Sequence, residues 1–356
     1  MDFDIRKEKR LMVKSLKRDI NYICNICDKE LALLEGKTVL ITGATGLIGF
    51  NLVSVLATCK YHINILALIR NQNKAEIMYD GIDNKKVKYI VGDVTEVIEI
   101  KESVDFIIHA ASQTASKAFV SNPVETILTS VNGTRNMLEL AKKKSVSGFV
   151  YLSTMEVYGA PEKNEKITEN HGTNLDTMMV RSSYPESKRM CETLCKAYQS
   201  EYHVPIKIVR LTQTFGPGVK YDDGRVFAEF ARCVIEKKDI VLHTKGETER
   251  NYLYTADAVT GILKVLLRGI DGEAYNIANE NTYCSIYEMA KMVAEKCGNS
   301  EIKVIVQEYN ANNFGYAPIL KMNLDTSKIR KLGWKPSVGI IQMYENLIFS
   351  MMEERK

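Results

Sequence analysis

Short apolar runs rich in β-branched residues alternate with longer amphipathic stretches through the first two thirds of the chain. Apolar runs of this length predict buried strands, and periodic stretches near 46–58, 124–143 and 184–202 predict helices. This alternation predicts an α/β fold with a Rossmann-type doubly wound parallel sheet. The strands are expected at 37–42, 63–69, 87–91, 106–109, 149–153 and 206–211.

Beyond Phe215 the pattern loosens, and glycine-rich turns separate shorter elements. Helices near 226–236, 255–268 and 286–296 and strands near 240–242 and 302–306 predict a smaller α/β carboxyl-terminal substrate lobe. Three parts are therefore expected. They are an amino-terminal helical extension at 1–35, a dinucleotide-binding Rossmann domain at 36–212, and a mainly substrate-binding lobe at 213–356, of which about 250–268 returns to the Rossmann domain.

The extension carries apolar residues near helical spacing, which predicts one or two helices. Packing on the same chain or on a dimer mate is favoured over a membrane surface. Cys24 and Cys27 form a CxxC pair, but zinc needs two more ligands nearby and a redox role needs a βαβ context. We expect both cysteines on one amphipathic helix and no metal site.

Composition narrows the class of partner. The 356 residues are 45% hydrophobic and 26% charged, and 48 basic against 44 acidic residues leave a net charge of +4. This balance does not indicate a nucleic-acid partner. No stretch of about twenty apolar residues indicates a membrane span, Met1–Lys7 lacks the apolar core of a signal peptide, and eight scattered cysteines suit a reducing compartment. A cytoplasmic protein is expected.

A glycine-rich turn follows the first strand at Gly43, Gly46 and Gly49. The first glycine permits a tight turn, the second allows close approach of a pyrophosphate, and the third allows the helix to pack on the strand. Phosphates would then bind the free N–H groups at the helix start. Plain turns also use glycine, but strand, loop and helix together predict a dinucleotide site.

The end of the second strand decides which dinucleotide is favoured. NAD enzymes usually carry an acidic residue there, whereas this chain has Arg70 followed by Asn71. An arginine slightly favours NADP through its 2′-phosphate. A solvated surface arginine is the alternative, and NAD stays open. Asp93 and Val94, after the third strand, are placed for the adenine edge.

Tyr184 and Lys188 stand four residues apart, on one face of a predicted helix. A nearby cation is expected to lower the phenol pKa, so that tyrosine acts as general base toward an alcohol. The lysine would also hold the nicotinamide ribose. A surface pair is the alternative, but the helix lies downstream of a dinucleotide loop in the same α/β unit.

Thr154 and Glu156 follow the strand at 149–153, at the carboxyl edge where open sheets place their active sites. Thr154 is expected to donate a hydrogen bond to the reacting oxygen, and Glu156 to act as a second base or carboxylate anchor. A helix cap and a solvated loop acid are the respective alternatives.

With these residues assembled, the chain resembles the extended short-chain dehydrogenase/reductases over about residues 37–350. It is most similar to the NAD(P)-dependent nucleotide-sugar epimerase/dehydratase family, and within it to the UDP-glucuronate decarboxylases. The motifs that carry the resemblance are Thr42-Gly-Ala-Thr-Gly-Leu-Ile-Gly49, His109-Ala-Ala-Ser112, Ser153-Thr-Met-Glu-Val-Tyr-Gly159, Arg181-Ser-Ser-Tyr-Pro-Glu-Ser-Lys-Arg189, Phe215-Gly-Pro217, Asp223-Gly-Arg-Val226, Arg250-Asn-Tyr-Leu-Tyr-Thr-Ala-Asp257 and Leu332-Gly-Trp-Lys-Pro336.

The resemblance implies a nucleotide-diphosphate sugar as substrate and a homodimer formed through helices at 124–143 and 184–202. Sugar C4 would be oxidised with Tyr184 as base, the 4-keto group would permit epimerisation or loss of a carboxylate, and the hydride would return. Gln213, Arg225 and Arg250 would bind substrate, with surface salt-bridging as the alternative for the two arginines. The cofactor would contact Gly43, Thr45, Gly46, Leu47, Ile48, Gly49, Arg70, Asp93, Val94, Ala110, Ala111, Ser112, Thr129, Tyr184 and Lys188.

Departures from the family pattern limit the outcome of the reaction. The 4,6-dehydratases have an aspartate acid where this chain has Met155, and a thioether transfers no proton, which argues against dehydration. The decarboxylase branch prefers serine there, which weakens that assignment as well, and Ser130 replaces a usual asparagine. Arg70 keeps an NADPH-dependent 4-ketosugar reductase open, and a catalytically silent cofactor-binding protein is the remaining alternative.

Overall fold

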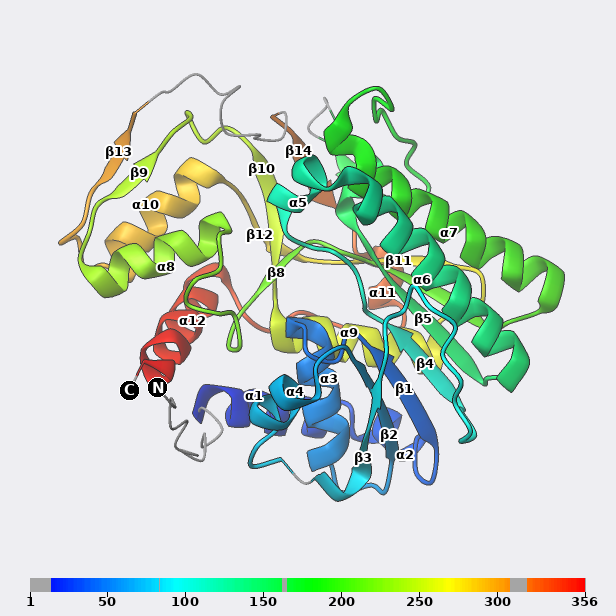
Figure 1. Ribbon diagram of the computed structural model, residues 1–356. Helices are drawn as coiled ribbons and strands as arrows, with labels where there is room; N and C mark the ends of the chain where they lie inside the picture. Colours follow the sequence, from blue (N-terminus) through cyan, green and yellow to red (C-terminus); the bar gives the residue numbers. More distant parts are fainter. Residues whose placement is uncertain (1–13, 83, 162–164, 308–318, 356) are drawn as a thin grey trace, which may run out of the picture.

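A computed structural model describes residues 14–82, 84–161, 165–307 and 319–355 (Figure 1). Within these residues the central sheet has seven strands, all paired in parallel, in the order β11-β7-β5-β4-β1-β2-β3. The predicted doubly wound α/β fold is confirmed. The strands are β1 (Thr38–Thr42), β2 (Asn64–Ile69), β3 (Val87–Val91), β4 (Phe106–His109), β5 (Gly148–Thr154), β7 (Ile206–Leu211) and β11 (Ala274–Ile277).

The order of the strands reverses at β1. From there β2 and β3 extend in one direction, and β4, β5 and β7 extend in the other. Open parallel sheets bind ligands outside the carboxyl ends of the strands at such a switch point. All five residues of β1 are buried, because helices cover both faces, and this explains why its sequence shows no alternation of polar and apolar residues.

Two helical layers sandwich this sheet. α3 (Leu47–Thr58) and α9 (Thr255–Arg268) cover one face, and α6 (Pro123–Lys144) and α7 (Ser183–Tyr202) cover the other. α6 and α7 pack against each other, and α4 (Gln72–Met78) lies between β2 and β3 in sequence. None of the helices in the described part of the chain is long and apolar enough to cross a membrane.

A second lobe forms from the carboxyl-terminal residues. Its larger sheet joins β12 (Asn279–Ser285), β10 (Glu249–Tyr254), β14 (Lys321–Leu324) and β6 (Lys166–Ile167), and β8 (Gln213–Phe215) pairs with β10. Its other elements are α8 (Val226–Glu236), α10 (Ile286–Lys296), α11 (Ser327–Arg330), α12 (Ile340–Glu354) and the pair β9 (Ile240–Leu242) and β13 (Val304–Val306).

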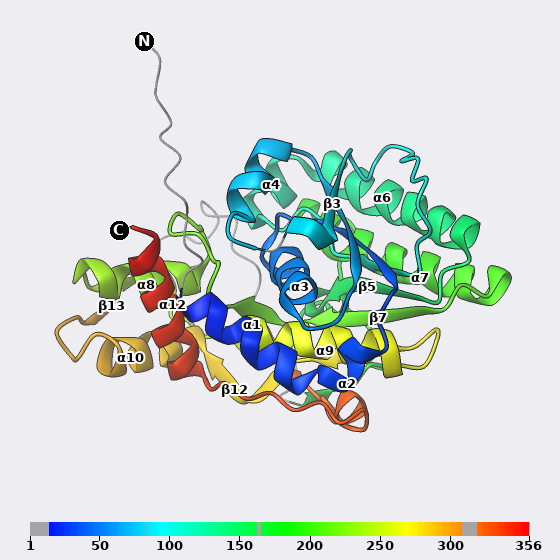
Figure 2. The same ribbon diagram turned by 90° about the horizontal axis from the view of Figure 1, so that it is seen from below.

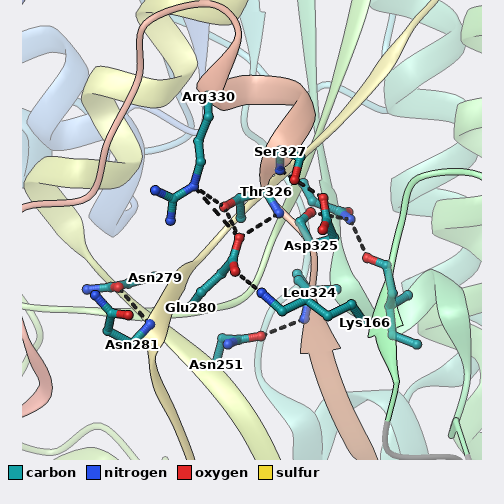
Figure 3. Close-up of polar contacts among 12 residues, drawn as sticks. Lys166, Asn251, Asn279, Glu280, Asn281, Leu324, Asp325, Thr326, Ser327 and Arg330 are labelled. Atoms are coloured by element: carbon teal, nitrogen blue, oxygen red, sulfur yellow. Dashed lines mark hydrogen bonds and ion pairs between the residues drawn. The ribbon is translucent and has the colours of Figure 1, made fainter.

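Besides the segment 250–268, other parts of the chain also cross between the two lobes. β11 and α9 lie on the first sheet, whereas the two-residue β6 leaves the first half to pair with β14. Figure 3 shows the contacts at this crossing: Glu280 accepts from Thr326 Oγ1 at 2.5 Å and pairs with Lys166 and Arg330. These contacts tie β6, β12 and the start of α11 together.

The amino-terminal extension packs on the chain itself. α1 (Lys14–Ile26) lies beside α9 and contacts α3 and α12 (Figure 2), and α2 (Asp28–Ala32) follows it. Residues 1–13 of the expected extension lie outside the described residues. Tyr254 donates to Asp19 at 2.5 Å, and Glu30 pairs with Arg268. The extension is therefore fastened to the core by buried polar contacts.

The CxxC pair does not lie on one helix as expected. Cys24 is in α1, whereas Cys27 stands in the turn that precedes α2, because the helix ends at Ile26. Burial raises the pKa of both thiols. No group of three or more His, Cys, Asp or Glu side chains in the described residues is arranged to hold a metal ion.

Candidate active site

A cavity of about 580 Å³ opens along the carboxyl ends of β1, β2, β4, β5 and β7. Every residue expected from the sequence to bind cofactor or to take part in catalysis lines it, from the glycine-rich turn to Tyr184 and Lys188. Gln213 and Arg225 line it as well, whereas Arg250 does not. The cavity therefore gathers residues that are up to about 180 positions apart in sequence, since parallel strands end at one edge.

The glycine-rich turn joins β1 to α3 in a geometry that side chains would block. Gly43 has φ +65°, and a Cβ there would lie 2.8 Å from the Ala111 nitrogen. A Cβ on Gly49 would lie 2.2 Å from the Gly43 oxygen. Gly46 precedes α3, whose first N–H groups lack partners within the helix. This cradle fits the pyrophosphate of a dinucleotide.

A buried hydrogen-bond network fixes this turn against the loop after β4. Thr42 Oγ1 accepts from the backbone nitrogens of Ala110 at 3.1 Å and Ala111 at 3.0 Å. It also bonds His109 Nδ1 at 2.7 Å. Burial lowers the pKa of His109 to about 3, so this imidazole is neutral at physiological pH and acts as a structural partner.

At the adenosine end of the cavity, Arg70 is loosely held. Its Nη1 lies 3.9 Å from Asp93 Oδ2, and 82% of its side chain is exposed. Asp93 accepts from the Thr95 nitrogen at 2.9 Å and from its hydroxyl at 2.8 Å, and these hydrogen bonds lower the pKa of the carboxyl. Asp93 is thus fixed, while Arg70 is free to turn toward a ligand.

Lys188 is a buried residue in the lining of the cavity. Its Nζ donates to the Leu152 oxygen at 2.7 Å and lies 4.8 Å from the centroid of the Tyr151 ring. Only 3% of the residue is exposed, and this burial lowers the pKa of Lys188 to about 8. The ammonium is therefore held in a fixed position by the Leu152 oxygen.

Tyr184 lies at the start of α7, the helix that also carries Lys188. Its ring stacks on Phe119 with 4.2 Å between centroids and 3° between planes. Burial raises the pKa of Tyr184 well above its usual range, and the Glu156 carboxylate raises it further. The Thr154 hydroxyl and the guanidinium groups of Arg181 and Arg225 oppose this rise. The expected lowering of the phenol pKa is wrong in this structure, because burial outweighs the neighbouring cations.

The turn after β5 brings Thr154 and Glu156 to the cavity. Thr154 precedes the short helix η2 (Met155–Tyr158) and accepts from the Glu156 nitrogen at 3.3 Å, so the capping alternative also holds. The Glu156 carboxylate pairs with Arg181 Nη2 at 2.8 Å. Sequence reasoning assigned no role to Arg181, although it stands three residues before Tyr184 within the motif that carries the resemblance.

Met155 lines the cavity but is only 4% exposed. Its side chain belongs to a small apolar cluster with Ile167 of β6 and with Met322 and Leu324 of β14. The Thr212 hydroxyl lies 3.2 Å from its sulfur. The residue that replaces the dehydratase acid therefore packs against strands of the second lobe.

The three expected substrate residues occupy different surroundings. Gln213 is in β8 beside the cavity, and Arg225, at the start of α8, forms paired hydrogen bonds with Asp223 at 2.9 and 2.6 Å. Arg250 lies in β10, and its Nε is buried without a hydrogen-bond partner among the described residues. The structure does not bring Arg250 to the cavity with the other two.

Comparisons with known proteins agree with this geometry. The sequence model of the NAD dependent epimerase/dehydratase family matches residues 39–278. UDP-glucuronic acid decarboxylase 4 of Arabidopsis thaliana is 32% identical over 305 residues, and the match spans 85% of this chain but only 66% of that relative.

Two solved structures share the fold at lower identity. An epimerase from Methanothermobacter thermautotrophicus is 24% identical, with a TM-score of 0.77 over 92% of this chain and 95% of the other. UDP-glucuronic acid 4-epimerase from Bacillus cereus, solved in complex with NAD, is 23% identical, with a TM-score of 0.73 over 90% of this chain and 100% of the other.

Proposed function

Because this chain belongs to the NAD-dependent epimerase/dehydratase family, we propose that it modifies a nucleotide-diphosphate sugar through a transient 4-keto sugar. The observation that carries the proposal is the single cavity that holds the glycine-rich turn together with Thr154, Tyr184 and Lys188. The reaction is an epimerisation or a decarboxylation in which the nicotinamide cofactor is recycled. UDP-glucuronic acid is the first substrate to test, since the decarboxylase of Arabidopsis thaliana is named for it.

The chain's own groups divide the work. The bound cofactor supplies a reversible hydride acceptor. Tyr184 takes the proton of the sugar C4 hydroxyl and later returns it, and Thr154, whose hydroxyl lowers the pKa of the phenol, orients the reacting oxygen. Lys188 lines the same cavity as the glycine-rich turn, and its Nζ lies 6.0 Å from the centroid of the Tyr184 ring, so it supplies a positive charge that favours the phenolate form. Glu156 faces the sugar ring as a carboxylate held by Arg181.

The test is direct incubation with nucleotide sugars. Purified protein is mixed with UDP-glucuronate and with other UDP-, GDP-, CDP- and dTDP-sugars, and products are identified by mass spectrometry while reduced-nicotinamide absorbance is followed. We expect product without net change in that absorbance. Tyr184→Phe, which keeps the ring and its stacking, should lower turnover by about 100- to 10,000-fold. Absence of product with every nucleotide sugar would refute the proposal and favour a silent cofactor-binding protein.

Arg70 supports NADP as an accepted cofactor and keeps a net 4-ketosugar reductase as second candidate. Its exposed guanidinium suits the 2′-phosphate. We expect Arg70→Ala to weaken NADP binding by about tenfold, one charge-assisted contact, and to leave NAD binding nearly unchanged in calorimetric titrations. Equal effects on both cofactors would remove this candidate, and stoichiometric consumption of NADPH would establish it.

A homodimer in a reducing compartment completes the proposal. α6 exposes Val124, Ile127 and Leu128, and α7 exposes Met190, so these helices offer an apolar face of the kind found at obligate interfaces. All eight cysteines are free within the described residues, which suits the cytoplasm. Light scattering of the protein and of Leu128→Glu tests the dimer. A monomeric wild type would exclude it.

A further inference from the structure

Phe119 connects the short helix α5 (Ser116–Ser121) to the start of α7. It is 2% exposed, and its ring stacks face to face on the ring of Tyr184. The Arg181 guanidinium carbon lies 4.8 Å from the centroid of the same ring. In addition, Ser183 Oγ donates to the Phe119 carbonyl at 2.8 Å. Arg181, Ser183 and Tyr184, just before and at the start of α7, therefore all contact Phe119.

Arg181 acts at a second point. Its Nη2 lies 2.8 Å from Glu156 Oε2, and only 17% and 29% of the two side chains are exposed. Glu156 and Phe119 line the cavity, whereas Arg181 does not. Arg181 thus lies behind two cavity residues and contacts both of them. A planar guanidinium can stack its face on a ring while its edge binds a carboxylate, whereas a lysine ammonium acts as a point charge without a planar face.

These contacts couple the charge and the orientation of the phenol. Glu156 raises the pKa of Tyr184, and Arg181 opposes this effect in part. The other cations near the phenol are Arg225 and Lys188. On the adjoining elements, Glu125 of α6 lines the cavity and Lys117 of α5 is exposed. Removal of Arg181 alone would leave an uncompensated carboxylate beside the reacting oxygen.

We propose that Arg181 is a positioning residue for the reacting phenol, orienting Tyr184 through Phe119 and holding Glu156 toward the sugar ring. A residue needed only for folding would make the same contacts without affecting the phenol. The positioning role therefore predicts that changes of Arg181 alter kcat and the titration of Tyr184, whereas a purely structural role predicts neither. Both roles predict the same effect on thermal stability.

The kinetic experiment rests on the proposed function. Arg181→Gln removes charge and stacking, Arg181→Lys keeps the charge, and Phe119→Leu removes the stack while Phe119→Tyr keeps it. The matched control is Arg268→Gln, which breaks an Arg–Glu pair with Glu30 on the other face of the sheet. We expect Arg181→Gln, Arg181→Lys and Phe119→Leu to lower kcat by about 100-fold with smaller changes in KM. Phe119→Tyr should retain more of the wild-type kcat than Phe119→Leu, and the control should stay within about threefold of wild type.

A second readout needs no substrate. The phenol of residue 184 is titrated by ultraviolet difference between each protein and the same protein carrying Tyr184→Phe. In Arg181→Gln the phenol should titrate at higher pH than in wild type, because Glu156 is uncompensated. The double variant Arg181→Gln with Glu156→Gln should reverse this shift, since both charges are gone.

The outcomes separate the two proposals. If Arg181→Gln matches Arg268→Gln in kcat and leaves the titration of Tyr184 unchanged, the positioning role is wrong, whatever its melting temperature. If no nucleotide sugar is turned over, the proposed function fails, and the titration of the phenol alone decides the role of Arg181. A shift in the titration of Tyr184 in Arg181→Gln that is reversed by adding Glu156→Gln supports the positioning role of Arg181.

Discussion

Replacing Lys188 with methionine should change the pH dependence of stability in a defined direction. Lys188 is 3% exposed, and burial lowers its pKa from 10.5 to about 8. The folded protein therefore binds this proton less tightly than the unfolded chain does. Protonation penalises the folded state fully below about pH 8, and the penalty fades as pH rises toward 10.5. Methionine has a similar length but carries no titratable proton, so Lys188→Met does not have this penalty.

The size of the penalty follows from the two pKa values of Lys188. Their difference corresponds to about 3 kcal/mol at about 1.4 kcal/mol per pKa unit. Between pH 9.5 and pH 6 the penalty grows by about 2 kcal/mol. Loss of the hydrogen bond to the Leu152 oxygen costs the variant about 1–3 kcal/mol at every pH. The prediction therefore concerns how the stability difference between Lys188→Met and wild type changes with pH, and not the sign of that difference at one pH.

Urea unfolding of the cofactor-free protein at pH 6 and 9.5 measures this change. We expect the free energy of unfolding of Lys188→Met to gain about 2 kcal/mol relative to wild type on going from pH 9.5 to pH 6, while turnover is lost. Lys207→Met is the control: Lys207 is also buried, but its ammonium pairs with Asp271 at 2.7 Å, so this variant should show no such gain. A difference between Lys188→Met and wild type that is the same at both pH values would refute the reasoning.

Two further substitutions test the cradle and the turn after β5. Gly49→Ala places a Cβ 2.2 Å from the Gly43 oxygen, so it should destabilise the fold by about 1–3 kcal/mol and abolish dinucleotide binding in calorimetry. Gly172→Ala is the control: its Cβ meets nothing within 4 Å, so stability and binding should stay unchanged. Retained dinucleotide binding by Gly49→Ala would contradict the packing argument. Met155→Asp should lower the free energy of unfolding by about 2–4 kcal/mol at pH 7 because it buries a carboxylate in an apolar cluster, and mass spectrometry should detect no 4,6-dehydration product. Met155→Leu, the control, should keep the stability of the wild type. Dehydration by Met155→Asp would show that the acid alone was missing.

The main sheet could be predicted from the sequence because most of its strands are buried on both faces, although β3 at its edge is partly exposed. The strands expected at 87–91, 106–109 and 206–211 have the bounds observed for β3, β4 and β7. Continuous apolar runs of this kind are set by local composition. The gathering of distant residues into one cavity could also be predicted, since it follows from the common edge of parallel strands.

Features that depend on tertiary contacts could not be read from the sequence. The six-residue α5 and the two-residue β6 are too short to show periodicity. The grip on Phe119 joins side chains more than sixty positions apart in sequence, and nothing local to Phe119 indicates it. The pKa of Tyr184 differs from the expectation for the same reason: the spacing to Lys188 is local, whereas the burial that dominates comes from packing.

Met155 shows how the choice of reaction is built into the packing between the lobes. It stands between Thr154 and Glu156, and its side chain packs with β6 and β14. An aspartate at this position would have to turn toward the cavity to act as an acid, and the cluster with Met322 and Leu324 would then lose its central side chain. The change from the dehydratase residue therefore removes a proton donor and at the same time attaches the catalytic turn to the second lobe. Recovery of dehydration would require repacking of β14 as well as one substitution, so the preference that we propose for epimerisation or decarboxylation rests on both lobes together.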